Sequence, residues 1–213
     1  MLALQALVVV LAPINHNMIL LLAVVSGFLV GLCHAHWYKQ AYVAPNFQAI
    51  WLAMIAFLPQ LVIAYIPVTH QLFNNGLASV SLLASLVLFS LFAWLNRHLP
   101  GMPILIVGLL LNFLVIVANG GWMPISPQTA NLLVGKNILQ FMNLGDRFGE
   151  KDILLLTQHT HLEFLADRFL LPAWLPYKTA FSLGDILIGL GAFWLLAQPA
   201  SKINSMDKES VLV

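Results

Sequence analysis

Five long runs of apolar residues divide the chain into segments of the length that a membrane crossing requires. A helix of about 20 predominantly apolar residues spans the hydrocarbon core of a bilayer. Polar or proline-containing stretches separate the runs, and the first four runs contain no charged residue. The pattern predicts membrane helices at 18–33, 47–66, 76–95, 103–118 and 181–197.

The remaining chain consists of an apolar leader (1–17), a polar excursion (119–180) and a polar tail (198–213). The leader has no basic start and no clear cleavage site, so it does not read as a signal peptide. It is also too short to span a membrane alone. We therefore expect an all-α, polytopic membrane protein with a single domain over 18–197, about five transmembrane helices and one long outer loop.

Composition supports this class. Of 213 residues, 61% are apolar and 8% are charged, with a net charge of +1, whereas soluble domains carry about 25% charged residues. Such a chain is not expected to be a cytosolic enzyme or to bind nucleic acid. The single cysteine, Cys33, cannot form an internal disulfide. The expected partner is membrane lipid.

The few charges also predict an orientation. Residues 1–118 carry only Lys39 and Arg97, whereas 119–180 carries ten charged residues. Short cytoplasmic connections are enriched in Lys and Arg, which places the segments after the first and third spans in the cytoplasm together with the tail. The N-terminus and the excursion are then outside.

Within the excursion, Thr160 and Glu163 have the spacing of a capping box, in which both side chains bond free amides at a helix start. Apolar residues at helical spacing follow, up to Pro172. We expect a short amphipathic helix there, lying on the membrane surface. His159 and His161 would share a face with Glu163 in a strand, but a helix start scatters these three ligands. Only Glu163 and Asp167 would then remain one helical turn apart. No metal or other cofactor is therefore expected.

The sequence Asn119-Gly120-Gly121 follows the fourth run. Consecutive glycines permit left-handed backbone and a sharp exit from a helix. The segment is interpreted as a helix cap at the outer interface; the alternative is a bend that lines a ligand cavity. Asn112, a polar residue within the fourth span, is a further candidate for lining a cavity.

Several of these residues resemble an uncharacterised family of bacterial polytopic membrane proteins. The resemblance rests on Asn96-Arg97-x-x-Pro100-Gly101, Asn112, Asn119-Gly120-Gly121-x-Met123-Pro124, Lys151-Asp152, Asp167 and Phe181-Ser182-x-Gly184-Asp185. It implies a protein of the bacterial cytoplasmic membrane with about five spans, and it carries no activity.

Asp185 is the single carboxylate within a predicted span. Buried acids in membranes are candidates for function because their charge is costly to bury. The spacing of Ser182 and Asp185, with Gly184 between them, is also that of a capping box, in which the carboxylate serves the helix start. Both interpretations stay open.

A shorter resemblance links Asp167-Arg168 and Phe181-Ser182-x-Gly184-Asp185 to lipoprotein signal peptidase. It implies a pair of catalytic aspartates, Asp167 and Asp185, at the outer membrane face. The chain departs from that family at two positions. The family has an asparagine three residues before the first aspartate, where this chain has Phe164, and another asparagine where this chain has Ser182.

The first span carries small residues four apart, Ala23, Gly27 and Gly31, which let two helices approach closely. They serve either packing within the chain or pairing of two copies.

Three functions follow from these patterns. The favoured one is a non-enzymatic binding or scaffold bundle acting at the outer face of the membrane. The alternatives are an aspartyl intramembrane hydrolase that uses Asp167 and Asp185, and a small-solute transporter.

Overall fold

The structure is a computed structural model that describes residues 18–65, 75–135, 137–149, 151–172 and 178–198. The leader and nearly all of the tail lie outside the described residues. Within the described residues the fold is mostly helical, as expected. Its apolar helices are α3 (Met18–Trp37), α4 (Ile50–Tyr65), α6 (Asn75–Leu95), α7 (Met102–Ala118) and α9 (Leu183–Ala197).

Each apolar run of the sequence coincides with one of these helices, with ends that differ by a few residues. The largest difference is at the end of α3, which continues to Trp37. Two helices, α3 and α6, are long and apolar enough to cross a bilayer, whereas α7, α9 and Ile50–Pro59 of α4 are shorter apolar helices.

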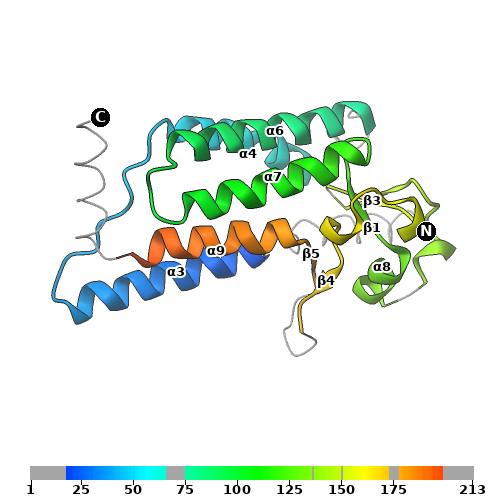
Figure 1. The fold of residues 1–213 in the computed structure, drawn as a ribbon. Helices are drawn as coiled ribbons and strands as arrows, with labels where there is room; N and C mark the ends of the chain where they lie inside the picture. Colours follow the sequence, from blue (N-terminus) through cyan, green and yellow to red (C-terminus); the bar gives the residue numbers. More distant parts are fainter. Residues whose placement is uncertain (1–17, 66–74, 136, 150, 173–177, 199–213) are drawn as a thin grey trace.

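The helices form an arc in the order α3, α9, α7, α6, α4, in which each packs against the next (Figure 1). Glycines let α7 and α9 approach closely, because Gly108 and Gly184 face each other as Gly101 and Gly191 do. A Cβ atom built on Gly108 would lie 2.6 Å from the carbonyl oxygen of Gly184, and one on Gly191 would lie 2.7 Å from that of Gly101. The matched spacing of seven residues produces a close antiparallel pair.

The small residues of α3 face α9. A Cβ atom on Gly27 would lie 2.7 Å from the carbonyl oxygen of Phe193, and one on Gly31 would collide with that of Leu196. Ala23 lies against Gly189. In the described structure this ridge packs α3 onto α9 within one chain.

The excursion contains strands that the expected all-α class did not include. Strand β1 (Met123–Ile125) pairs in parallel with β3 (Asp152–Leu154), and β2 (Arg147–Phe148) pairs antiparallel with β3. Helix α8 (Pro127–Val134) follows β1, and β4 (Phe169–Leu170) pairs antiparallel with β5 (Ala180–Phe181). We call residues 119–181 the β module; it lies at one end of the helix bundle (Figure 1).

The short amphipathic helix expected after Thr160 is not formed. The segment instead makes two single 3-10 turns, Thr157–His159 and Glu163–Leu165, and then strand β4. The hydroxyl of Thr160 donates to the carbonyl of Leu156 at 3.0 Å, so it does not cap a helix. A parallel bridge between Asp167 and Ile125 holds the chain extended where the helix was expected, which shows that tertiary pairing outweighs the local pattern.

Each region has its own apolar core. The bundle core includes Leu86, Leu99, Met102, Ile116 and Leu195. The core of the β module includes Ile125, Ala130, Phe148, Leu154 and Ala180. The two regions meet where α7 ends and α9 begins.

Candidate functional site

The first turn of α9 positions two polar side chains of the site, Ser182 and Asp185. The amide of Asp185 donates to Ser182 Oγ at 3.0 Å, and the amide of Ser182 donates to Asp185 Oδ2 at 3.1 Å, which together form a capping box. Two amides that have no partner within the helix are thereby satisfied. The Asp185 side chain is thus fixed at the helix start.

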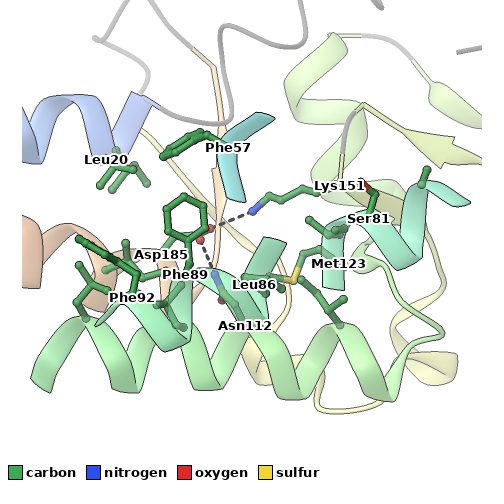
Figure 2. Close-up of a pocket in the computed structure, with 17 residues that line it drawn as sticks. Leu20, Phe57, Ser81, Leu86, Phe89, Phe92, Asn112, Met123, Lys151 and Asp185 are labelled. Atoms are coloured by element: carbon green, nitrogen blue, oxygen red, sulfur yellow. Dashed lines mark hydrogen bonds and ion pairs between the residues drawn. The ribbon is translucent and has the colours of Figure 1, made fainter. Parts of the chain in front are cut away.

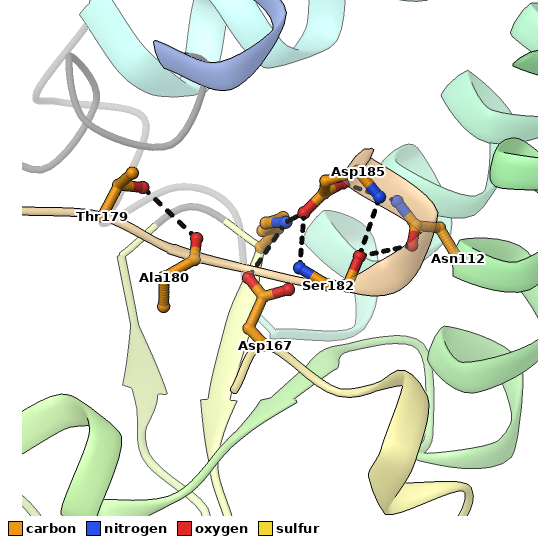
Figure 3. Close-up of polar contacts among 7 residues, drawn as sticks. Asn112, Asp167, Thr179, Ala180, Ser182 and Asp185 are labelled. Atoms are coloured by element: carbon orange, nitrogen blue, oxygen red, sulfur yellow. Dashed lines mark hydrogen bonds and ion pairs between the residues drawn. The ribbon is translucent and has the colours of Figure 1, made fainter. Parts of the chain in front are cut away.

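Asn112 of α7 joins this cap to the neighbouring helix (Figure 3). Its Nδ2 donates to Asp185 Oδ1 at 2.7 Å, and Ser182 Oγ donates to its Oδ1 at 2.9 Å. Gly184 makes this possible, because a Cβ atom at that position would collide with Asn112 Oδ1. Three polar side chains from two helices are thus locked into one arrangement.

Lys151 brings the β module into the same site. Its Nζ lies 3.0 Å from Asp167 Oδ2 and 3.2 Å from Asp185 Oδ2. The lysine is held just before β3, where its carbonyl accepts a bond from the amide of Met123 at 2.9 Å. We call Asn112, Lys151, Asp167, Ser182 and Asp185 the Lys151 cluster. It unites the two aspartates singled out in the sequence, with an ammonium group between them.

The two members of this cluster that come from the β module, Lys151 and Asp167, have pKa values shifted by burial and by their charged neighbours. Burial raises the pKa of Asp167 well above its ordinary value, and the attraction of Lys151 does not compensate, because Asp152 and Asp185 also raise it. Apart from the ion pair, neither carboxylate oxygen of Asp167 has a hydrogen-bond partner. Burial lowers the pKa of Lys151, but the nearby carboxylates outweigh it and the net direction is upward. Lys151 therefore stays charged, whereas burial makes the ionised form of Asp167 more costly than that of an exposed aspartate.

An apolar cavity of about 260 Å³ lies inside the arc of helices, and Asn112, Lys151 and Asp185 line it (Figure 2). Apolar side chains from α3, α4, α6, α7 and α9 make up most of the remaining wall, and Ser81 contributes one hydroxyl. The arrangement can hold an apolar group in the cavity and offer hydrogen bonds to a polar group at the cluster.

The Asn-Gly-Gly segment lies apart from this cavity wall. Asn119 ends α7, and its side chain exchanges two bonds with the backbone of His161, at 2.9 and 3.0 Å. Gly120 and Gly121 have φ angles of 75° and 91°, which favour glycine. This segment therefore fastens the β module to the bundle.

The histidines and acids considered as metal ligands do not converge. Glu163 pairs with Arg168 at 3.0 Å. In the described part of the chain, no three His, Cys, Asp or Glu side chains are placed to hold a metal ion.

Sequence reasoning missed Lys151 as a site residue. It appeared there only as part of the family resemblance, beside Asp152. It also missed Gly101, Gly108 and Gly191, although the matched spacing of seven residues on two apolar runs was a readable signal of close packing.

Comparison with known proteins identifies relatives. Residues 45–197 match the model of the Family of unknown function (DUF5317). The chain is also 34% identical over 113 residues to an uncharacterized protein of Thermotoga maritima, an alignment that covers 52% of this chain and 58% of the relative. The chain thus spans little more than half the length of that relative. No solved structure matches the chain.

Proposed function

The chain belongs to the DUF5317 family, whose function is unknown, and we propose that it is a multi-pass membrane protein that binds an amphipathic ligand. The apolar part of the ligand occupies the cavity within the arc of helices, and its polar part contacts the Lys151 cluster. The observation that carries this proposal is a cavity with apolar walls and a fixed polar cluster among its lining residues.

The outer surface of the bundle supports five membrane crossings. All five apolar helices carry large apolar side chains that are about half exposed. Examples are Leu29 (54%), Met54 (66%), Val80 (63%), Leu114 (52%) and Leu190 (52%). Soluble monomers rarely expose apolar patches this extensive, whereas lipid would cover them.

The direction of the helices supports the same topology. Helices α3 and α9 run parallel, since Gly27 packs near Phe193 and Gly31 near Leu196, as the first and fifth spans of a five-span chain must. The segments with Lys39 and Arg97 follow the ends of α3 and α6, opposite the β module (Figure 1). The positive-inside rule then places the β module outside, and we assign the protein to the bacterial cytoplasmic membrane.

The volume of the cavity and the helices that line it favour a single apolar chain as the ligand. Its volume, about 260 Å³, lies just below the range of about 300 to 1,000 Å³ typical of pockets for drug-sized ligands. Helices α3 and α4 are the two ends of the arc and share no extensive contact among their described residues. Both contribute to the cavity wall, so a lipid chain could enter sideways between them.

The charges of the cluster favour a neutral polar group on the ligand. Lys151 already contacts the carboxylates of Asp167 and Asp185, so an anionic group would meet a carboxylate beside the ammonium. A cationic group would in turn be repelled by Lys151. A hydroxyl or carbonyl oxygen can accept a bond from Lys151 without either penalty.

The geometry favours binding over hydrolysis or transport. An aspartyl hydrolase needs two carboxylates that share a proton in near contact, but here Lys151 lies between Asp167 and Asp185 and contacts both. The polar cavity-lining side chains are Ser81, Asn112, Lys151 and Asp185, which does not outline a polar route through the helices. Pairing of two copies through Gly27 and Gly31 would have to displace α9.

The test uses purified protein in nanodiscs and three probes that share a dodecyl chain, namely dodecanol, dodecyl phosphate and dodecylamine. We expect dodecanol to bind saturably and at least tenfold more tightly than the two charged probes. Leu109→Trp, which fills the cavity from a buried position, should reduce dodecanol binding at least tenfold. A preference for dodecyl phosphate would contradict the neutral head group.

The matched control is the next residue of the same helix. Leu110 is 48% exposed, whereas Leu109 is 6% exposed and lines the cavity. Leu110→Trp should therefore bind dodecanol like the unaltered protein. Equal affinities in the two variants, with both folded by circular dichroism, would refute the proposed cavity. A reporter fused after Val213 should be cytoplasmic, and a reporter signal from outside would refute the orientation.

A further inference from the structure

A second, polar pocket of about 180 Å³ lies in the β module. Asp167 lines this pocket, whereas its ion-pair partner Lys151 lines the apolar cavity. The ion pair therefore stands between two spaces of opposite character. Four residues that carry a hydroxyl line the polar pocket, Ser126, Thr129, Thr157 and Thr160, and the charged residues Glu163 and Arg168 line it as well.

Asp167 contributes a carboxylate oxygen that has no hydrogen-bond donor. Its side chain is fully buried, and Oδ1 has neither a hydrogen bond nor an ion pair in the structure. A buried acceptor without a donor is costly and calls for a physical explanation. A ligand hydroxyl in the pocket would supply the missing donor.

Hydrogen bonds hold three of the pocket hydroxyls in place. Ser126 Oγ caps α8 by accepting from the amide of Thr129 at 3.1 Å, and it lies 2.9 Å from Thr129 Oγ1. Thr160 Oγ1 donates to the carbonyl of Leu156 at 3.0 Å. Because its proton is used there, the lone pairs of Thr160 can accept bonds from a ligand.

The charges around the pocket are paired, which argues for a neutral ligand. Glu163 and Arg168 form an ion pair of 3.0 Å, and Asp167 pairs with Lys151. An anion would face two carboxylates. A metal ion would lack a ligand set, because no three candidate side chains come together among the described residues.

We propose that this pocket binds a small, neutral polyhydroxyl group, of the size of one sugar ring or an inositol, with one ligand hydroxyl donating to Asp167 Oδ1. The site is separate from the apolar cavity and goes beyond the function proposed above. The polyhydroxyl group can be a free molecule or the head group of a lipid whose chain occupies the cavity, and the experiment separates these sources.

The experiment is equilibrium dialysis with radiolabelled glucose, myo-inositol and glycerol against protein in a detergent without a sugar head group. We expect glucose or myo-inositol to bind saturably. Thr160→Val and Asp167→Leu should each weaken that binding at least tenfold, because each removes a hydrogen-bonding group from the pocket. Thr179→Val is the matched control, since Thr179 is a buried threonine of the same module outside the pocket.

A second arm compares dodecyl glucoside with dodecanol in nanodiscs. If the polyol is a lipid head group, dodecyl glucoside binds at least tenfold more tightly than dodecanol, and Thr160→Val removes this advantage. Leu109→Trp should reduce dodecanol binding at least tenfold and leave free-sugar binding unchanged, so failure of one site does not mimic failure of the other. The proposal is overturned if neither arm shows saturable polyol binding up to tens of millimolar, or if Thr160→Val binds as well as Thr179→Val.

Discussion

The helix bundle and the β module are stabilised by different kinds of contact. In the bundle, glycines such as Gly108 and Gly184 bring backbones together, and apolar side chains point both inward and outward. In the β module, short strands, capped turns and paired charges hold a small polar structure. A helix satisfies its own backbone hydrogen bonds and can therefore carry apolar side chains on every face, whereas irregular backbone needs water or polar partners.

The Lys151 cluster lies where these two regions meet and combines both kinds of contact. Asn112 and Asp185 come from closely packed helices, while Lys151 and Asp167 come from the β module. A side chain at this junction therefore contributes to the stability of both regions. Its removal should cause the largest loss of unfolding free energy.

Lys151→Met removes the cation that the buried carboxylate of Asp167 shares with the partly buried carboxylate of Asp185. Removal of one partner of a buried ion pair costs about 3 to 5 kcal/mol, so we expect a loss of unfolding free energy in that range. Thermal unfolding in detergent, followed by circular dichroism, measures it. Adding Asp167→Asn should recover part of the loss, because one unpaired carboxylate is then gone.

The control for this variant is Lys178→Met, since Lys178 is an exposed lysine of the same module. It should unfold within about 0.5 kcal/mol of the unaltered protein, as surface substitutions generally do. Equal effects of the two substitutions would show that the cluster does not hold the regions together.

The helices of the bundle could be predicted from the sequence because each one coincides with a single long apolar run. A residue on any face of α3 or α6 can be apolar, so an uninterrupted apolar run suffices to locate the helix. The capping box of Ser182 and Asp185 was equally readable, since it depends on residues three apart.

The strands and the lysine could not be found in the same way. Strands β1 and β3 are three residues long and pair across a wide separation in sequence, so no periodicity marks them. Thr160 and Glu163 have a helical spacing that tertiary pairing of Asp167 with Ile125 overrides. Lys151 is one of several basic residues in a polar stretch, and only the fold brings it to α9.

Alanine substitutions at two glycines, Gly184 in the bundle and Gly120 in the β module, should destabilise the protein for different reasons. Gly184→Ala places a Cβ atom against Asn112 Oδ1, and overpacking of this kind costs about 1 to 3 kcal/mol. Gly120 has a φ of 75° and no neighbouring atom within 4 Å of an added Cβ, so Gly120→Ala meets only backbone strain, of about 1 to 2 kcal/mol.

Asparagine substitutions at Gly120 and Gly184 distinguish a steric clash of the side chain from strain in a left-handed backbone. Asparagine tolerates left-handed backbone, so Gly120→Asn should unfold closer to the unaltered protein than Gly120→Ala. At Gly184 the order should reverse, with Gly184→Asn less stable than Gly184→Ala because the clash grows. Thermal unfolding of the four variants measures this, and the same order at both positions would remove the distinction between the regions.

The smallest expected effect concerns the pH dependence of Asp167. Its pKa in the folded protein is raised, chiefly by burial, above the value of about 3.9 for an unperturbed aspartate. The protonated form therefore favours folding, and this contribution is full below the unfolded pKa and lost as the pH rises through the folded pKa. Asp167→Asn mimics the protonated form and should not lose stability in this way.

Unfolding of Asp167→Asn and of the unaltered protein, measured in parallel from pH 4 upward, checks this prediction. The difference should grow with pH in favour of the variant, to about 1 kcal/mol near neutral pH, the low end of the cost of a buried acceptor without a donor. If the unaltered protein instead gains on the variant as the pH rises, Asp167 is ionised and stabilised by Lys151. The β module would then tolerate the charge of Asp167 as well as the capped start of α9 tolerates that of Asp185. The contrast between these two aspartates would be lost.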